Sequence, residues 1–298
     1  MKNEKFPPIL IFGKNGQVGF ELCRSLSYIG EVSAIDIEDC DLTNKKSIHE
    51  SLEFFRPSII VNAAAYTGVD KAEKEKDLAF KLNAEAPGII ADWANINNAL
   101  MIHYSTDYVF DGTKNGPWTE DDTPNPLNVY GKSKLTGDTN IQNSGCDHFI
   151  FRTSWIYGTR GKNFYLTMRK LLTEKDEIQV VDDQFGAPTW CRTIADVTSI
   201  ALMQYISNQA LHNKDIFGIY NLTNSGSTTW HGFTKAVREQ MLGRDNNLKL
   251  ANIIPIGSDQ YPLPAKRPKN SALSSEKIEK NFMIKIPNWQ KSLDDVKS

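Results

Sequence analysis

Residues 8–19 read PILIFGKNGQVG, and this stretch decides the fold because it joins a strand pattern to a helix pattern. Its first half is an apolar run that is typical of a buried strand. The next residues, QVGFELCRSLSYIG, have the spacing of an amphipathic helix. Between the two patterns the chain places three glycines: Gly13, Gly16 and Gly19.

This glycine turn predicts a site for a dinucleotide. Glycine lets the backbone turn tightly and approach a pyrophosphate, while the helix N-terminus supplies free N–H groups and a favourable dipole. The spacing is G-x-x-G-x-x-G, a variant of the G-x-G-x-x-G fingerprint. An ordinary glycine turn is the alternative, so the prediction depends on residues further along the chain.

An acidic residue stands in the expected place. Asp36 closes the next strand candidate, EVSAID (31–36), where a carboxylate can accept hydrogen bonds from the adenosine ribose hydroxyls. The same carboxylate repels a 2′-phosphate, which favours NADH over NADPH. Lys14 could compensate in part, so NADPH remains open. Asp41 and Leu42 follow a second turn and could border the adenine.

Strand and helix patterns continue to alternate through the first half of the chain. A helix is expected over TNKKSIHESLEFFRP, with Thr43 as its N-cap and Pro57 at its end. Another is expected over 77–98, and further strands over 58–65, 99–106 and 148–158. This alternation predicts an α/β fold, a Rossmann-like doubly wound parallel sheet with helices on both faces.

The second half has a different character. It is richer in Pro and Asn, with short strand candidates IQVVDD (178–183) and GIYNLTN (218–224) and a proline-bracketed loop, YPLPAKRPKNS. We expect an NAD(P)-binding domain over 1–160 and a smaller α/β domain, mainly substrate-binding, over 161–298, from which some segments return to the first.

The third strand candidate ends in Asn62, Ala63 and Ala64, beside the expected cofactor. Small side chains there would let the backbone come close to it. Ordinary helix–sheet packing explains the alanines equally well.

A candidate catalytic pair lies in NVYGKSKLTG (128–137). On a helix, residues four apart are neighbours, so Lys134 lies beside Tyr130 and Lys132 does not. A nearby cation lowers the pKa of a phenol, which makes it a usable proton donor. Thr106 ends the fourth strand, whose carboxyl end faces the ligand crevice of such sheets.

Together Thr106, Tyr130 and Lys134 predict a carbonyl-reduction site. The threonine would hydrogen-bond the substrate oxygen, the tyrosine would donate a proton, and the lysine would hold the nicotinamide ribose. Ser105 should face the other side of the strand and is interpreted as structural, and Lys132 as solvated.

Composition excludes several other classes of protein. The chain has 298 residues, 40% of them hydrophobic, and a net charge of −2, so it carries no global basic field for nucleic acid or membranes. No apolar run approaches the ~18 residues of a membrane span, and the N-terminus lacks a secretory signal. The scattered cysteines and histidines predict neither disulfides nor a zinc site. We expect a cytoplasmic protein.

The sequence resembles the extended, nucleotide-sugar branch of the short-chain dehydrogenase/reductases, and within it the dTDP-4-dehydrorhamnose reductases, over nearly the whole chain. The resemblance is carried by GKNGQVG, VNAAAYTGVDKAE, HYSTDYVFDG, PLNVYGKSKLTG, FRTSWIYG, DQFGAPT and PAKRPKNSAL. It implies reduction of the C4 ketone of a dTDP-6-deoxy-hexulose with NADPH or NADH, giving dTDP-L-rhamnose for cell-surface polysaccharide.

The resemblance also assigns residues. It implies the catalytic set Thr106, Tyr130 and Lys134. The cofactor contacts that it implies are Gly16, Gln17, Val18, Asp36, Asp41, Leu42, Ala65, Tyr66 and Thr67. For the sugar nucleotide it implies Thr106, Asp107 and Trp155.

Two of the substrate candidates also have a physical reason. The aromatic face of Trp155 suits the apolar face of a 6-deoxy sugar, with a core tryptophan as the alternative. Arg267 is a candidate for the substrate diphosphate, because guanidinium groups pair well with phosphate oxygens. An ordinary surface arginine is the alternative there.

One position departs from the resemblance. Some members form a dimer around magnesium, with carboxylates early in the first helix and shortly after GAPT. Glu21 matches the first position, but Arg192 stands at the second. We therefore expect no metal site, and a monomer or weak homodimer.

Other functions remain open at this stage. A 4,6-dehydratase needs an Asp-Glu pair after the threonine, whereas this chain has Asp107 and Tyr108. Another nucleotide-sugar epimerase or reductase is an alternative. So is a non-catalytic NAD(P)-binding regulatory subunit, although such a protein has no need of the Thr–Tyr–Lys set.

Overall fold

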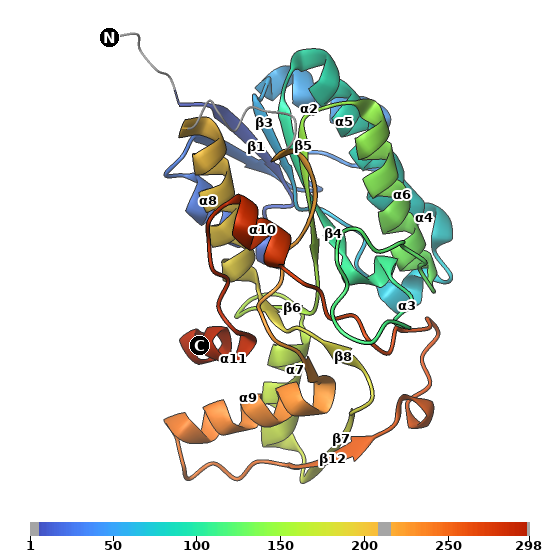
Figure 1. Ribbon diagram of the computed structural model, residues 1–298, viewed down its shortest axis with the longest axis vertical. Coiled ribbons are helices and arrows are strands. Elements are labelled where there is room, and N and C mark those ends of the chain that lie inside the picture. Colours follow the sequence, from blue (N-terminus) through green and yellow to red (C-terminus); the bar gives the residue numbers. More distant parts are fainter. Residues whose placement is uncertain (1–5, 208–215, 297–298) are drawn as a thin grey trace.

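The computed structural model describes residues 6–207 and 216–296, and a six-stranded parallel sheet lies at its centre (Figure 1). The strand order is β10-β5-β4-β3-β1-β2. Strand β2 therefore lies on one side of β1, and the later strands follow one another on the other side. The strands are β1 (Pro8–Phe12), β2 (Glu31–Ile35), β3 (Ile59–Asn62), β4 (Leu100–Thr106), β5 (His148–Thr153) and β10 (Gly218–Asn221). The predicted doubly wound α/β fold is confirmed.

Helices cover both faces of this sheet. In Figure 1 α5 and α6 lie to its right, and α8 and α10 to its left. The bounds are α1 (Gln17–Leu26), α2 (Lys45–Phe55), α5 (Ala86–Asn97), α6 (Val129–Ser144), α8 (Cys191–Ser207) and α10 (Glu276–Asn281). Alternate residues of β1 enter two separate cores: Ile9 and Ile11 pack with α1 and α8, whereas Leu10 and Phe12 pack with α2 and α5. Such burial on both sides explains the unbroken apolar run.

Several expected boundaries differ from the structure. The third strand stops at Asn62, and the following alanines leave the sheet. The segment expected as one strand over 148–158 is two, β5 and the short β6 (Ile156–Tyr157), because Trp155 has a positive φ of 46°. The 77–98 helix begins as α4 (Lys76–Phe80) and passes through a π-helical turn, Lys81–Glu85, into α5.

The expected cap of the second helix is wrong. Asn44 is the N-cap of α2, and its side chain accepts hydrogen bonds from the backbone N–H groups of Lys46 and Ser47. Thr43 instead donates its hydroxyl to Asp41 over 2.7 Å. Asn and Thr both cap helices well, and only the backbone path decided between neighbours.

The rest of the chain forms a smaller layer below the sheet in Figure 1. Its helices are α7 (Phe164–Glu174), α9 (Trp230–Arg244) and α11 (Trp289–Asp295), which share a core that includes Tyr165, Phe233 and Leu293. Three two-stranded ladders belong to it: β12 (Asn252–Ile256) with β7 (Glu177–Val181), β11 (Thr228–Thr229) with β8 (Phe185–Gly186), and β6 with β9 (Thr189–Trp190).

Two segments from the second half lie with the first half. The GIYN part of GIYNLTN is β10, which pairs in parallel with β5 as the edge strand of the main sheet. Helix α8 packs along α1 through residues such as Ile194 and Ala195, which share a core with Leu22. Elements from both halves of the sequence therefore build the main sheet and the helix layer beside α1.

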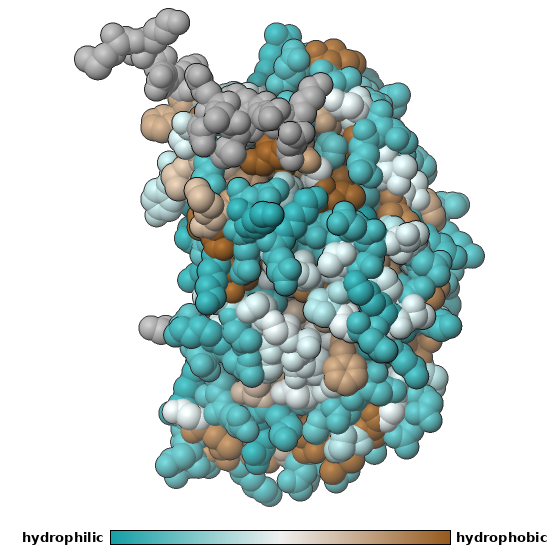
Figure 2. All heavy atoms as spheres, viewed as in Figure 1, coloured by the Kyte–Doolittle hydropathy of each residue, from teal (hydrophilic) through white to brown (hydrophobic). Residues whose placement is uncertain are grey.

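No helix in the described ranges is long and apolar enough to cross a bilayer. On the face shown in Figure 2, hydrophilic residues dominate and hydrophobic residues are scattered among them.

Candidate active site

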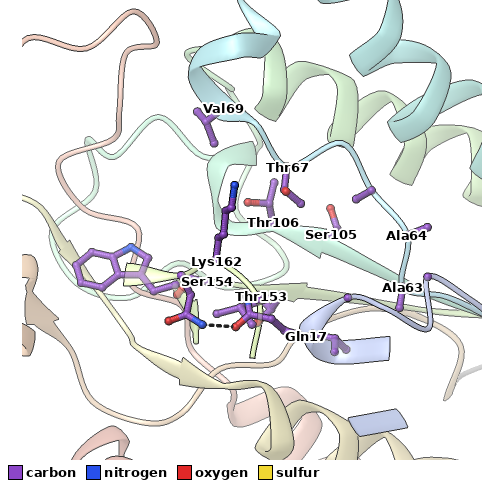
Figure 3. Close-up of a pocket in the computed structure, with 18 of the residues that line it drawn as sticks. Gln17, Ala63, Ala64, Thr67, Val69, Ser105, Thr106, Thr153, Ser154 and Lys162 are labelled. Carbon is purple, nitrogen blue, oxygen red and sulfur yellow. Dashed lines mark hydrogen bonds between the residues drawn. The ribbon is translucent and has the colours of Figure 1, made fainter. Parts of the chain in front are cut away.

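A cavity of about 670 Å³ opens at the carboxyl ends of the central strands. The glycine turn, the ends of β3 and β4, the start of α6 and the segment after β5 all contribute to it, as Figure 3 shows in part. The predicted site residues that line it are Gly13, Gly16, Gln17, Val18, Asp36, Ala63, Ala64, Ala65, Thr67, Thr106, Asp107, Tyr130 and Trp155. Open α/β sheets bind ligands in this place.

The glycine turn fits a dinucleotide diphosphate. Gly13 has a φ of +88°, and a Cβ there would lie 2.8 Å from the backbone nitrogen of Ala64. A Cβ on Gly19 would collide with the carbonyl oxygen of Gly13, so this residue packs α1 against the turn rather than lining the cavity. Gly16 is the N-cap of α1 and has no side chain to occupy the first N–H groups. Those groups stay available to an anion.

Asp36 lies at the far end of this turn. Its carboxylate accepts hydrogen bonds from the backbone N–H groups of Asn15 and Ile37, both over 2.8 Å. Lys14, the residue that could offset its charge in part, donates to Asp39 over 2.6 Å. That contact pairs the ammonium with a carboxylate other than Asp36 and raises the pKa of Lys14.

A second cavity of about 320 Å³ adjoins the first and shares Gly13, Asp36 and Ala64 with it. Asp41 and Leu42 line this smaller cavity, together with apolar side chains such as Ile37 and Leu82. A flat heteroaromatic base fits between such groups. Tyr66 lines neither cavity, because its hydroxyl donates to Glu75 over 2.7 Å.

The carboxyl end of β4 presents buried polar groups to the cavity. Thr106 and Asp107 are only 4% and 3% exposed. The Thr106 hydroxyl donates to Asp107 over 3.0 Å and accepts from the backbone N–H of Tyr108. Burial raises the pKa of Asp107 to about 7, although its hydrogen bonds with Ser271 and Thr106 lower it. This carboxyl group can therefore hold a proton near neutral pH.

Tyr130 is the second residue of α6 and lines the same cavity as these groups. Asn128 is the N-cap, and its side chain accepts a hydrogen bond from the backbone N–H of Gly131 over 2.8 Å. The ring of Tyr130 meets that of Tyr108 edge to face, with centroids 6.0 Å apart. Burial raises the pKa of Tyr130 to about 12, and the Thr106 hydroxyl beside it lowers it.

Lys134 is one helical turn beyond Tyr130 but does not line the cavity. Its ammonium lies 2.6 Å from the carbonyl oxygen of Tyr104 and 3.0 Å from Nε2 of His103. The expectation that it lowers the pKa of Tyr130 is wrong for this structure: the pKa is raised by burial, and Lys134 is not among the groups that shift it. Lys132 is exposed, as expected.

Trp155 lies in the cavity wall, stacked on another tryptophan. Its ring and that of Trp230 are 3.4 Å apart at their centroids and inclined by 6°. Gly186 leaves room for the indole, since a Cβ there would collide with it. One face of Trp155 is thus occupied by the protein.

Arg267 does not line the main cavity. Its guanidinium forms two hydrogen bonds with the carboxylate of Asp70, over 3.0 and 2.7 Å. It borders a separate cavity of about 1260 Å³ built largely from the loop 258–270. Arg267 is thus paired with Asp70, the residue that follows Val69 of the main cavity.

Glu21 is surrounded by cations from its own chain. Its carboxylate accepts from Nε of Arg24 over 3.0 Å and from Nε of Arg192 over 3.1 Å. Arg24 also pairs with Asp196 over 2.6 Å. Within the described ranges no group of three or more His, Cys, Asp or Glu side chains is arranged to hold a metal ion.

The sequence reasoning missed the loop Gly158–Asn163, which forms the wall facing the glycine turn. Asn163 donates to Gln17 over 2.8 Å, a contact drawn as the dashed line in Figure 3. The guanidinium of Arg160 stacks on the ring of Phe20 in α1, with Cζ 3.7 Å from the ring centroid. Lys162 extends into the cavity between Ser154 and Thr106 (Figure 3). The glycines in YGTRGKN gave the only local signal for this loop.

The chain is similar in sequence to a known family of proteins. Residues 7–298 match the family described as the RmlD substrate binding domain. The chain is 44% identical to dTDP-4-dehydrorhamnose reductase of Salmonella typhimurium (strain LT2) over 286 residues, which are 95% of this chain and 94% of the relative.

Solved structures agree as well. The crystal structure of dTDP-4-dehydrorhamnose reductase from Bacillus anthracis in complex with NADP superposes with a TM-score of 0.86 at 33% identity, covering 97% of this chain and 98% of that one. UDP-glucose 4-epimerase of Thermus thermophilus, in complex with NAD, has a TM-score of 0.79 at 17% identity and covers 97% of each chain. The latter likeness concerns the fold alone.

Proposed function

We propose that this chain, which belongs to the RmlD substrate binding domain family, reduces the C4 ketone of dTDP-4-dehydrorhamnose to give dTDP-L-rhamnose, with NADPH or NADH as the reductant. The product would serve cell-surface polysaccharide synthesis. One observation carries the proposal: Thr106 and Tyr130 face the same cavity as the glycine turn.

The reaction needs a proton donor at the ketone oxygen, since the bound nicotinamide supplies the hydride. Tyr130 lies in the cavity with its proton held at neutral pH by burial. It can give that proton as negative charge develops on the oxygen. The hydroxyl of Thr106, which donates to Asp107 in this structure, would turn to the same oxygen.

Asp107 would assist in two ways. It is buried beside Thr106 and lines the cavity, so it can contact the sugar nucleotide directly. A neutral carboxyl group, favoured by its raised pKa, can donate a hydrogen bond to a sugar hydroxyl. Trp155 would contact the sugar with its edge or its free face, because Trp230 covers the other.

The cofactor would lie along the glycine turn, with its diphosphate at the start of α1 and its adenine toward Asp41 and Leu42. Asp36 disfavours a 2′-phosphate, and Lys14 is held by Asp39. The related Bacillus anthracis enzyme was solved with NADP, so we propose that both cofactors serve. Asp36→Ala should raise kcat/KM for NADPH relative to NADH about tenfold.

Enzymatically prepared dTDP-4-dehydrorhamnose, mixed with purified protein, tests the function. Nicotinamide absorbance would be followed with NADH and NADPH in parallel, and the product identified by chromatography. We expect oxidation of the cofactor with formation of dTDP-rhamnose. Cofactor binding without oxidation would reject the reductase proposal and favour a regulatory role, and conversion of the sugar without net oxidation would favour an epimerase.

Three finer proposals go with this function. The first 160 residues would chiefly bind the cofactor and residues 161–298 chiefly the sugar nucleotide, with α8 and β10 returning to the first part. The protein would act in the cytoplasm as a monomer or weak homodimer without magnesium. The Glu21–Arg192 contact supports the last point, because it occupies the carboxylate within one chain.

A further inference from the structure

Lys134 has an unusual buried environment that the reaction scheme leaves unexplained. The side chain is 1% exposed, and the imidazole of His103 beside it is fully buried. Their contact, 3.0 Å between Nζ and Nε2, joins α6 to the middle of β4. Because water does not reach this contact, one of the two nitrogens must donate a hydrogen bond and the other must accept it.

Asn62 determines which nitrogen of that imidazole carries the proton. The backbone N–H of Ala64 donates to Oδ1 of Asn62 over 3.3 Å, so the amide nitrogen faces Nδ1 of His103, 3.2 Å away. An amide nitrogen only donates, so Nδ1 accepts and the neutral ring has its proton on Nε2. That proton points at Lys134.

An Nε2–H can donate to Lys134 only if the lysine is an uncharged amine. When Lys134 is an ammonium, Nε2 must accept instead, and the ring proton must move to Nδ1. Asn62 then has to turn its amide oxygen toward the ring and lose its hydrogen bond with Ala64. Protonation of Lys134 thus adds one proton to the Lys134–His103 pair. The His103 ring stays neutral, and its own proton moves from Nε2 to Nδ1.

We propose that His103 is a positioning residue for the reduction: it holds the amino group of Lys134, and its tautomer, set by Asn62, decides whether that group is an amine or an ammonium. The proposal rests on the proposed function for its catalytic meaning, because ketone reduction takes up one proton per turnover. The hydrogen-bond geometry that supports it does not depend on the substrate.

The charged groups around Lys134 and His103 are consistent with a lysine that titrates beside a neutral imidazole. Burial lowers the pKa of Lys134 to about 8, while Asp138 raises it. Burial and Lys134 together hold the pKa of His103 well below its usual value, so the ring stays neutral. The other charged neighbour is Arg152, which pairs with Asp138 over 3.3 Å, and Tyr130 is the neighbouring titratable group on α6.

Nitrogen NMR of protein labelled with ¹⁵N-histidine tests the device without any substrate. We expect the His103 signals to report a neutral ring with its proton on Nδ1 near pH 6 and on Nε2 near pH 10, changing at about pH 8 as Lys134 titrates. Lys134→Met should abolish the change. A single tautomer throughout, or a ring that becomes charged near pH 6, would overturn the proposal.

Variants test the consequence for turnover. His103→Phe removes the acceptor beside the ammonium, so the alkaline limb of the kcat/KM profile should move to lower pH, with a loss of about tenfold. His103→Gln should restore much of the rate. Asn62→Asp should move the limb to higher pH, because the new carboxylate draws the ring proton to Nδ1 and favours the ammonium.

Thr198→Val is the matched control. Its hydroxyl contacts that of Tyr104 over 2.9 Å, so the variant removes a buried polar contact to the same strand. We expect a lower Tm with an unchanged pH profile. Loss of rate in His103→Phe and Asn62→Asp without a shift of the alkaline limb, or no recovery of rate in His103→Gln, would mean a purely structural role. A wild-type protein inactive toward the sugar but showing the tautomer change would reject the proposed function alone.

Discussion

The cavity has two walls that differ in nearly every physical respect. The β4–α6 wall presents Thr106, Asp107 and Tyr130 to the cavity, and Lys134 is buried behind it. Most of these side chains are hydrogen-bonded within the protein. The loop wall, residues 158–163, is largely exposed and is fastened to α1 through Gln17 and Phe20.

We propose that the β4–α6 wall carries the chemistry and that the loop wall contributes to binding. On the β4–α6 wall, desolvation moves the pKa of Asp107 to about 7 and that of Lys134 to about 8. Groups that titrate near neutral pH can exchange protons during turnover. On the loop wall, Lys162 is the one cationic side chain among the described residues that line the cavity, and its exposed ammonium can meet an anion directly. Four variants test this contrast.

The largest effect is expected from Tyr130→Phe. The variant removes the proton donor and keeps the ring, so kcat should fall by about a thousandfold. The Kd for NADPH, measured by fluorescence, should change less than about threefold. Tyr28→Phe, at an exposed position that does not line the cavity, serves as control. Turnover close to that of the wild type would remove Tyr130 from the mechanism.

Lys134→Met should cost about a hundredfold in kcat/KM. It deletes a buried amino group that contacts Tyr104 and His103, whereas Lys132→Met changes an exposed neighbour on the same helix. Steady-state kinetics of the two variants measure the contrast. Equal losses would show that the effect comes from the helix and not from the buried amine.

Asp107→Asn should change the pH dependence of stability. The folded pKa is raised, so the carboxyl stabilises the fold fully below its unfolded pKa and loses that contribution as pH rises to about 7. Relative to wild type, the variant should therefore gain about 4 kcal/mol between about pH 4 and about pH 8, then remain level. Urea unfolding at several pH values measures the difference, and a pH-independent difference would contradict a protonated Asp107.

The smallest effect is expected on the loop wall. Lys162→Met should raise KM for the cofactor or the sugar nucleotide about threefold to tenfold and leave kcat nearly unchanged. Varying each ligand in turn shows which diphosphate is bound, and added salt should narrow the difference. Lys175→Met, at an exposed position after α7, is the control. A large fall in kcat in Lys162→Met would show that the loop wall also takes part in the chemical step, which would contradict the proposed difference between the two walls.

The sequence by itself determined the sheet, the glycine turn and the places of Thr106 and Tyr130. These features depend on local patterns: an apolar strand, glycines at a strand–helix junction, and polar residues where a buried strand ends. Parallel strands bring such ends to one edge, so residues far apart in the chain could be assigned to one site.

Only the tertiary structure decided which side chains meet. Asn163 holds Gln17, Arg267 pairs with Asp70, and Lys134 turns to His103 rather than to the phenol. The first two contacts join residues 146 and 197 positions apart, and no periodicity along the chain encodes them. The protonation states follow from the same cause, because a pKa depends on burial and on partners that the fold brings together.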